Sequence, residues 1–210
     1  MLDVHPPEHA PHGVRDFFLH IFTITVGLLI ALGLESLVEW RHHVHLGHQA
    51  AETMRRELEA NRKDLAEALG HVPEEQRNLK DLLQFSKQKE KGTATNLSSI
   101  RMGMSIATLH DASWQTASAT GALSYIPYEE AERFAAAYTL QKQFLEVQNG
   151  ALQPAIALEA LLGTEDPNSM EAGHAREVSA GIRTMMASIE TQREIGHDLD
   201  KVYDEALREQ

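Results

Sequence analysis

The chain has 210 residues, of which 24% are charged and 6% aromatic, and its formal net charge at neutral pH is −12. This acidic balance argues against general nucleic-acid binding, which requires a basic face, so we expect no nucleic-acid partner. Cysteine is absent, which excludes disulfides, thiolate catalysis and cysteine-ligated zinc.

An apolar run close to the N-terminus is the most informative segment of the sequence. Residues 17–34 read FFLHIFTITVGLLIALGL, and His20 is the only ionisable side chain among them. At 1.5 Å per residue this run forms a helix of about 27 Å, close to the hydrocarbon thickness of a bilayer. We therefore predict a transmembrane helix over residues 17–38, with Trp40 and Arg41 at the membrane–water interface.

Two other structures are compatible with this apolar run. A buried helix of a water-soluble protein would need a larger core than this chain offers. A cleavable signal peptide is the stronger alternative, because Ala31-Leu32-Gly33 resembles a small-x-small cleavage site. The helical pattern continues beyond that point, which favours retention of the run as an anchor.

The charges on either side of the run bear on its orientation in the membrane. Arg15 precedes it, while Arg41 and then Arg55 and Arg56 follow it, so the positive-inside rule is almost balanced. We expect a cytoplasmic N-terminal tail over residues 1–16 and an extracytoplasmic helical domain.

Small residues recur on one face of the predicted span. Thr23, Gly27 and Ala31 are four residues apart, and Glu35 continues the same stripe. Such stripes let two helices approach closely in a membrane, so we predict a helix–helix contact here. The Glu35 carboxyl is either buried in that contact, where it would suit a proton-linked role, or extended toward the headgroups.

Beyond the span, apolar residues recur every seven positions. One series forms heptad a positions and a second, three residues later, forms d positions. The pattern predicts a juxtamembrane helical stalk over residues 39–72, whose seam packs on a second copy or, as we prefer, on a later helix of the same chain. The a positions are Leu37, Val44, Ala51, Leu58, Leu65 and Val72, and the d positions are Trp40, Gly47, Met54, Asn61 and Ala68.

Histidines cluster at the start of this stalk. His42, His45 and His48 are three residues apart, so two consecutive members could reach one metal ion, and a second helix would have to complete the site. The alternative, which we prefer, is a polar interfacial face that holds no metal. We accordingly predict no cofactor.

Residues 73–210 are predicted to form an antiparallel helical bundle that packs with the stalk. Pro73 is expected to open the first helix of the bundle, because proline is favoured in the first helical turn, and this helix continues to about Lys89. A loop follows over residues 91–96. Residues 97–109 fit either a short helix or an extended piece.

Three further helices are predicted in the remaining chain. The first covers residues 111–123 and is rich in small side chains. Pro127 opens the second, and Pro154 kinks or restarts it. After a turn over residues 163–167, a long final helix places apolar residues at helical spacing. These are Val178, Ile182, Met185, Ile189, Leu199, Val202 and Ala206.

The apolar run and the stalk together resemble a known group of proteins. Residues 23–43 read TITVGLLIALGLESLVEWRHH, and residues 56–65 read RELEANRKDL. This is similar to uncharacterised bacterial proteins that begin with one transmembrane helix of the type VGILIAL, followed by a Trp-Glu neighbourhood and an EL-x-x-N stretch. Their later Trp and glycine-containing helix resemble residues 113–123. The resemblance implies a single-pass protein of the bacterial inner (plasma) membrane and assigns no activity.

No catalytic pattern is evident, because the sequence lacks a glycine-rich phosphate loop, a GxSxG elbow and an HExxH motif. We expect a membrane-anchored, non-enzymatic module that binds a protein partner or a second copy, as an accessory subunit, scaffold or self-assembling component. One alternative is a sensor-like domain that captures a small molecule near Trp114, Tyr138 and Gln141 and needs a partner for output. The other is a metal or haem binder built on the juxtamembrane histidines.

Overall fold

The computed structural model describes residues 13–97, 102–163 and 166–208 of the chain. These residues form four α-helices and two short 3-10 turns, with no strand among them, so the prediction of an all-α fold is confirmed. Most of the predicted N-terminal tail, residues 1–12, lies outside the described residues. The elements are α1 (Val14–Glu90), α2 (Ala112–Ala119), η1 (Ala122–Tyr125), α3 (Tyr128–Leu162), η2 (Pro167–Ser169) and α4 (Ala172–Leu207).

The first helix, α1, is continuous over 77 residues, which at 1.5 Å per residue is about 115 Å. The prediction that Pro73 opens a separate helix is wrong, because Pro73 lies inside α1. An interior proline removes one backbone hydrogen bond and costs a helix roughly 3 kcal/mol. Val72 and Glu75, on either side of it, are buried, and this packing keeps the helix continuous.

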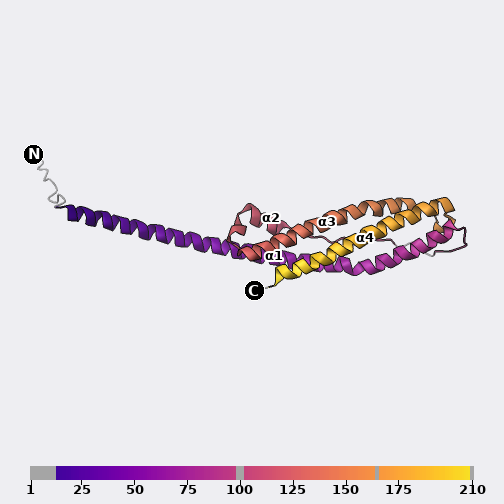
Figure 1. Cartoon of the computed structure of the whole chain (residues 1–210), viewed down its shortest axis with the longest axis horizontal. Helices are drawn as coiled ribbons and strands as arrows, with labels where there is room; N and C mark the ends of the chain where they lie inside the picture. The colour runs from indigo at the N-terminus through magenta and orange to yellow at the C-terminus, as the bar shows by residue number, and fades with distance from the viewer. Residues whose placement is uncertain (1–12, 98–101, 164–165, 209–210) are drawn as a thin grey trace, which may run out of the picture.

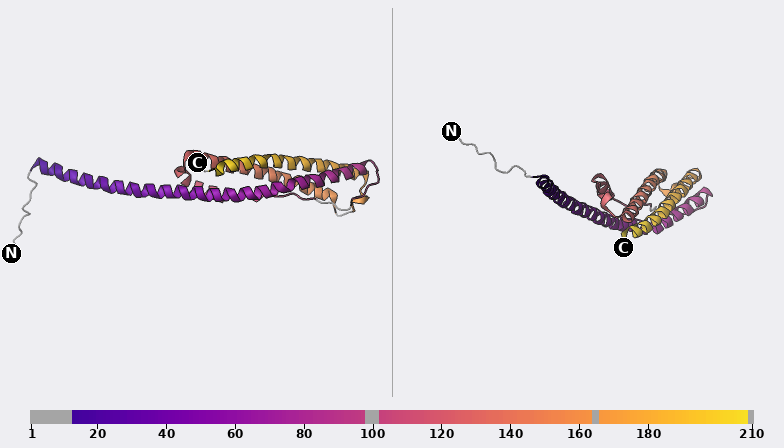
Figure 2. Two further views of the ribbon diagram at one scale, coloured as in Figure 1. Left: turned by 90° about the horizontal axis from the view of Figure 1, so that it is seen from below. Right: turned by 60° about the vertical axis from the view of Figure 1, so that its left-hand side comes forward.

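The helices divide the molecule into a free segment and a packed part. In Figure 1 the N-terminal third of α1 extends alone, whereas its C-terminal portion lies beside α3 and α4. Both views in Figure 2 keep these three helices together and show α1 curving gently. α4 packs against α1 and α3, while α2 and η1 contact α1 where it enters the packed part.

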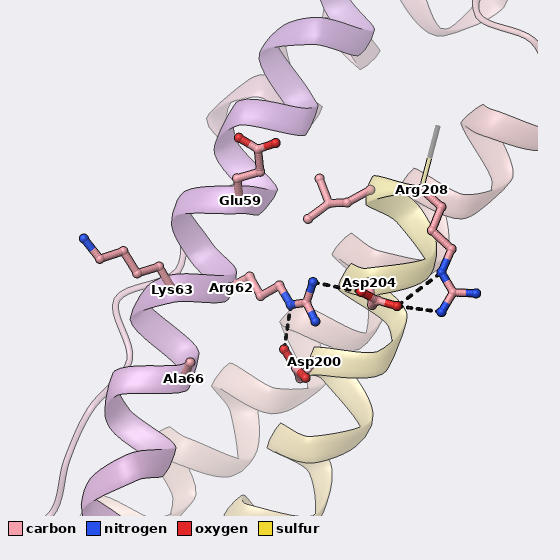
Figure 3. A pocket seen from close by; sticks show the side chains of 8 residues that line it. Glu59, Arg62, Lys63, Ala66, Asp200, Asp204 and Arg208 are labelled. Carbon is pink, nitrogen blue, oxygen red and sulfur yellow. Dashed lines mark hydrogen bonds and ion pairs between the residues drawn. The ribbon is translucent and has the colours of Figure 1, made fainter. Parts of the chain in front are cut away.

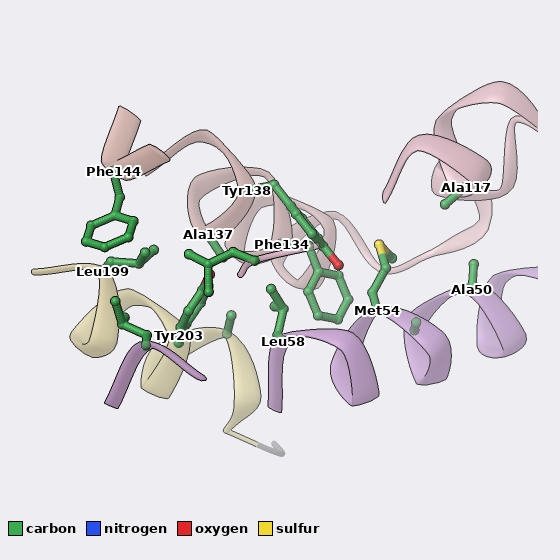
Figure 4. Packing of buried hydrophobic residues seen from close by; sticks show 14 of the residues in the cluster. Ala50, Met54, Leu58, Ala117, Phe134, Ala137, Tyr138, Phe144, Leu199 and Tyr203 are labelled. Carbon is green, nitrogen blue, oxygen red and sulfur yellow. The ribbon is translucent and has the colours of Figure 1, made fainter. Parts of the chain in front are cut away.

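The core consists of two clusters of buried side chains. The cluster nearer the free segment joins α1, α3 and α4 through Met54, Leu58, Phe134, Phe144 and Tyr203 (Figure 4). The cluster at the far end joins the same three helices. It contains the predicted apolar positions of the final helix, Val178, Ile182, Met185 and Ile189, together with Val72, Leu79, Leu82, Phe85 and Leu158.

The connection from α1 to α2 is not helical where it is described. Residues 91–97 and 102–111 lack regular secondary structure, so the helical alternative is wrong for the described part of residues 97–109. α2 ends at Ala119, before the predicted end at residue 123, because Gly121 adopts a left-handed φ of 73° that stops the helix.

The third helix begins where the sequence predicts and continues further than it predicts. Pro127 immediately precedes α3, as expected. Pro154, however, neither ends nor restarts α3, which passes through it. Ala151 and Leu158, on either side, are buried, so packing again overrides the local cost of proline.

Candidate functional site: an exposed apolar helix segment

The N-terminal segment of α1 is apolar and uncovered on every side. The most apolar 18-residue window of this helix has none of its residues buried, and by length and composition α1 is the only helix of the described residues that could cross a membrane. Phe18, Leu29 and Leu34 are each about 60% exposed. Water-soluble proteins rarely expose contiguous apolar patches of this extent, so the segment is the candidate functional site.

The small-residue stripe lies within this uncovered segment. Thr23, Gly27, Ala31 and Glu35 are all exposed. Thr23 donates its hydroxyl hydrogen bond to the backbone oxygen of Leu19, 2.9 Å away within the helix. A Cβ atom at Gly27 would meet nothing within 4 Å. The stripe is therefore free to receive a second helix.

The heptad seam is exposed at its N-terminal end and buried where α1 enters the packed part. Leu37 is 51% exposed and Val44 is half-buried, whereas Ala51, Leu58 and Leu65 are buried against the rest of the chain. The C-terminal part of the seam therefore forms the core between α1, α3 and α4, as the intramolecular alternative requires. Only its N-terminal end has no partner among the described residues.

The histidines that follow the apolar segment do not converge on one point. His42, His45 and His48 are exposed on a single helix, and the described residues contain no group of three or more His, Cys, Asp or Glu side chains placed to hold a metal ion. His43 instead stacks on Tyr125 of η1, with ring centroids 4.1 Å apart and an interplanar angle of 8°.

Three Glu-x-x-His pairs, which sequence reasoning overlooked, also use a spacing that metal-binding bundles employ. The pairs are Glu39/His42, Glu171/His174 and Glu194/His197. All six side chains are exposed rather than directed into the space between the helices.

Buried amide side chains hold the packed part together. Asn61 donates from Nδ2 to the backbone oxygen of His110 at 2.6 Å and to Oε1 of Gln141 at 3.0 Å. Its Oδ1 accepts from the His110 backbone N–H at 2.9 Å. Gln141 also accepts the Tyr203 hydroxyl, and burial raises the pKa of that tyrosine. Asn61 thus joins α1 to α3 and to the connecting segment, and Gln141 extends the network to Tyr203 of α4.

The same segment is bound by side chains further along the helices. Gln148 both accepts from the Ala107 N–H at 2.8 Å and donates to the Ala107 carbonyl at 3.0 Å. Glu75 accepts from the Ser105 N–H at 2.6 Å. These contacts satisfy the backbone of an extended piece that has no strand partner among the described residues, a role that sequence reasoning missed.

In the region that the sensor alternative assigns to ligand capture, the side chains of Trp114, Tyr138 and Gln141 contact other side chains of the protein. Trp114 stacks on Tyr138 with ring centroids 5.3 Å apart. The Tyr138 hydroxyl donates to Glu57 at 2.8 Å, and burial followed by this hydrogen bond raises the pKa of Tyr138. Gln141 is engaged by Asn61 and Tyr203, as described above. The polar groups expected to meet a ligand therefore meet one another.

A charged cluster lines a hollow on the surface between α1 and α4 (Figure 3). Arg62 donates from Nε to Asp200 at 2.8 Å and from Nη1 to Asp204 at 2.9 Å. Arg208 also donates to Asp204. Hydrogen bonds from Arg208 and Arg62 lower the pKa of Asp204. The cluster is half exposed and clamps two helices, which is a structural role.

Comparisons of this chain with protein-family models, curated proteins and solved structures found no match. The functional interpretation therefore depends on the molecule's own chemistry, and the resemblance to bacterial single-pass proteins stays a prediction.

Proposed function

We propose that the protein is a single-pass membrane protein of the bacterial inner membrane, whose helical domain is a non-enzymatic protein-interaction module. In this proposal residues 17–38 span the bilayer and the packed part lies outside it, on the extracytoplasmic side. The observation that carries the proposal is the complete exposure of the apolar part of α1 in a chain whose remaining helices bury their apolar faces.

The energetic reason is the cost of leaving that segment in water. Each fully exposed Leu, Ile or Phe side chain forgoes about 1.5–3 kcal/mol relative to burial. A bilayer removes this cost, and a helix brings its own backbone hydrogen bonds with it, as a lipid environment requires. Asp16 on one side and Glu39 with Arg41 on the other then lie at the two polar surfaces.

The packed part is proposed to be an antiparallel bundle around the pairing of α1 with α4. The contacts between these helices support this direction, because residue numbers fall on α4 as they rise on α1. Arg62 bonds to Asp200 and Asp204, Gln76 to Glu190, and Ser86 to Ser179. Because α1 is continuous from the span into this bundle, the domain is rigidly joined to its anchor.

The contact surface for a partner is proposed to be the stripe of Thr23, Gly27, Ala31 and Glu35. Its exposure leaves it available, and small side chains allow close helix approach in lipid. The favoured occupant is the same stripe on a second copy of the chain, since a twofold axis lets one face serve both partners. An accessory role beside another membrane protein would use the same face.

Disulfide cross-linking in native membranes tests this contact. The natural chain has no cysteine, so each single-cysteine variant carries one thiol. Gly27→Cys and Ala31→Cys place that thiol on the stripe, and Thr25→Cys and Leu29→Cys place it on the opposite face as matched controls. Oxidation is expected to give covalent dimers, or an adduct with one larger protein, only at the stripe positions. Equal cross-linking on both faces, or none on either, would contradict the proposal.

A further inference from the structure

Methionine side chains gather around a hollow toward the far end of the packed part. This methionine hollow has a volume of about 440 Å³ and is lined by Met102 and Met104 of the connecting segment, Met185 of α4 and apolar side chains of α3. Met102 and Met104 are half-buried, and Met185 is buried in the far-end core cluster. The chain has seven methionines and no cysteine, and three of the seven line this one hollow.

Hydrogen bonds of α3 set the level of the connecting segment and of α4. Gln148 accepts from the Ala107 N–H at 2.8 Å and donates to the Ala107 carbonyl at 3.0 Å. The same Gln148 oxygen accepts from Nε2 of Gln192, 3.3 Å away on α4. One turn-and-a-half of segment is not needed to reach Gln141, which bonds to the His110 carbonyl: the seven residues of α3 between the two glutamines cover about 10 Å. Three segment residues cover the same distance, so the segment is extended there.

The same rises place the methionines at one level. Residue numbers fall on the segment and on α4 as they rise on α3. Met104 lies three extended residues beyond Ala107, and Met185 lies seven helical residues beyond Gln192, in the same direction and by about 10 Å in each case. Met102 and Met104 are two residues apart, so an extended chain directs both side chains to one side. Two thioethers of the segment therefore lie beside a third on α4.

The methionine hollow is open to solvent and has one charged side chain in its wall. Gly103, between the two segment methionines, is exposed, and a Cβ atom there would meet nothing within 4 Å. Among the described residues, Glu159 is the only ionisable side chain that lines the hollow. A small cation can therefore enter, and a carboxylate is present to balance its charge.

Thioether sulfur is a soft, neutral ligand that has no proton to lose. Soft sulfur ligands select Cu(I), whereas carboxylate and carbonyl oxygens suit Mg²⁺, Ca²⁺ and Mn²⁺. We propose that Met102, Met104 and Met185 form a three-thioether site for Cu(I), with Glu159 balancing the charge of the ion. This inference goes beyond the proposed function and does not depend on the membrane span. The expectation of no cofactor rested on the histidines and did not consider thioethers.

Competition with a chromophoric Cu(I) chelator tests the site in the full chain, in mild detergent with ascorbate under nitrogen. The variant Met102→Leu/Met104→Leu removes two ligands, and leucine has nearly the volume of methionine, so the packing is retained. Met186→Leu is the matched control, because Met186 neighbours Met185 on α4 but does not line the hollow. Circular dichroism verifies that each variant is folded.

The natural chain and Met186→Leu are expected to bind one Cu(I) with equal affinity, and the double variant at least about tenfold more weakly. The affinity of the natural chain should be the same at about pH 7.5 and about pH 5.5, because thioethers do not titrate, whereas imidazoles with a pKa of about 6.5 become protonated.

X-ray absorption of the natural chain loaded with Cu(I) should show sulfur neighbours around the ion. This measurement and the pH comparison use the natural chain, so they decide the question even where the double variant does not fold. No bound Cu(I), an affinity unchanged in the folded double variant, binding lost at the lower pH, or nitrogen and oxygen neighbours alone would each overturn the site.

Discussion

At the level of single residues, amide side chains form the hydrogen bonds to the connecting segment that a neighbouring strand would form in a sheet. The connecting segment has no strand to pair with among the described residues, yet the N–H and C=O groups of His110 and Ala107 are bonded by Asn61, Gln141 and Gln148. Unpaired buried groups would each cost about 1–3 kcal/mol. These side chains therefore decide where the segment lies.

The Asn61→Ala variant is expected to lose about 2–3 kcal/mol in the free energy of unfolding, because the buried His110 N–H loses its acceptor and a small cavity remains. Urea titration of the full chain in mild detergent, followed by circular dichroism, measures this. Asn149→Ala is the matched control, since Asn149 is exposed on α3. An effect at Asn61 no larger than at Asn149 would contradict the role assigned to the network.

The Asp204 carboxylate is expected to make the free energy of unfolding decrease at acidic pH. Its folded-state pKa is lowered by Arg208 and Arg62, so its contribution is complete above the unfolded pKa of about 3.9 and is lost as pH falls through the folded value. The urea concentration at the unfolding midpoint of the natural chain should therefore decrease as the pH is lowered from 5 to 2.5. The decrease should be smaller in Asp204→Asn. Glu205→Gln removes an exposed carboxylate from the same helix as the charge control.

At the level of elements, periodicity in the sequence predicts which residues pack but not where helices end. The heptad positions Leu58, Asn61 and Leu65 are buried as a seam requires. The boundary predicted at Pro73 and the restart offered as one alternative at Pro154 are wrong, because tertiary packing on both sides of each proline exceeds a purely local cost. Which helix covers the seam is a matter of three-dimensional arrangement, and periodicity does not carry that information.

Substitutions at Gly47 and Gly70, both in α1, distinguish the effect of packing on stability from the effect of helix propensity. A Cβ at Gly47 would lie 2.4 Å from the Tyr125 oxygen, whereas at Gly70 nothing lies within 4 Å. Gly47→Ala is expected to displace η1 and to lower the free energy of unfolding by about 1–3 kcal/mol. Gly70→Ala should raise it by up to about 1 kcal/mol, because alanine is the better helix former. Urea titration measures both changes in the free energy of unfolding, which should have opposite signs. A free energy of unfolding that is lower in both variants would contradict the close approach of η1 to α1 at Gly47.

At the level of the whole molecule, one helix contains both the uncovered apolar segment and one side of the packed core. The sequence predicted the apolar segment and its length, since both follow from composition and rise per residue. The docking of η1 on α1 could not be predicted, because Tyr125 and His43 meet only in the folded arrangement of η1 and α1. Histidine spacing gave a metal site only as the less favoured alternative, and His42, His45 and His48 belong to no group of three or more potential metal ligands among the described residues.

The location of residues 17–34 is tested most directly by thiol labelling in opened native membranes, where both surfaces are accessible. We predict that a water-soluble maleimide leaves Leu28→Cys unmodified until the membrane is dissolved in denaturing detergent. Ala66→Cys, on an exposed face of the packed part of α1, should be modified at once. Modification of Leu28→Cys as fast as Ala66→Cys, or no modification of it even after denaturation because the segment has been cleaved away, would contradict a membrane-spanning helix.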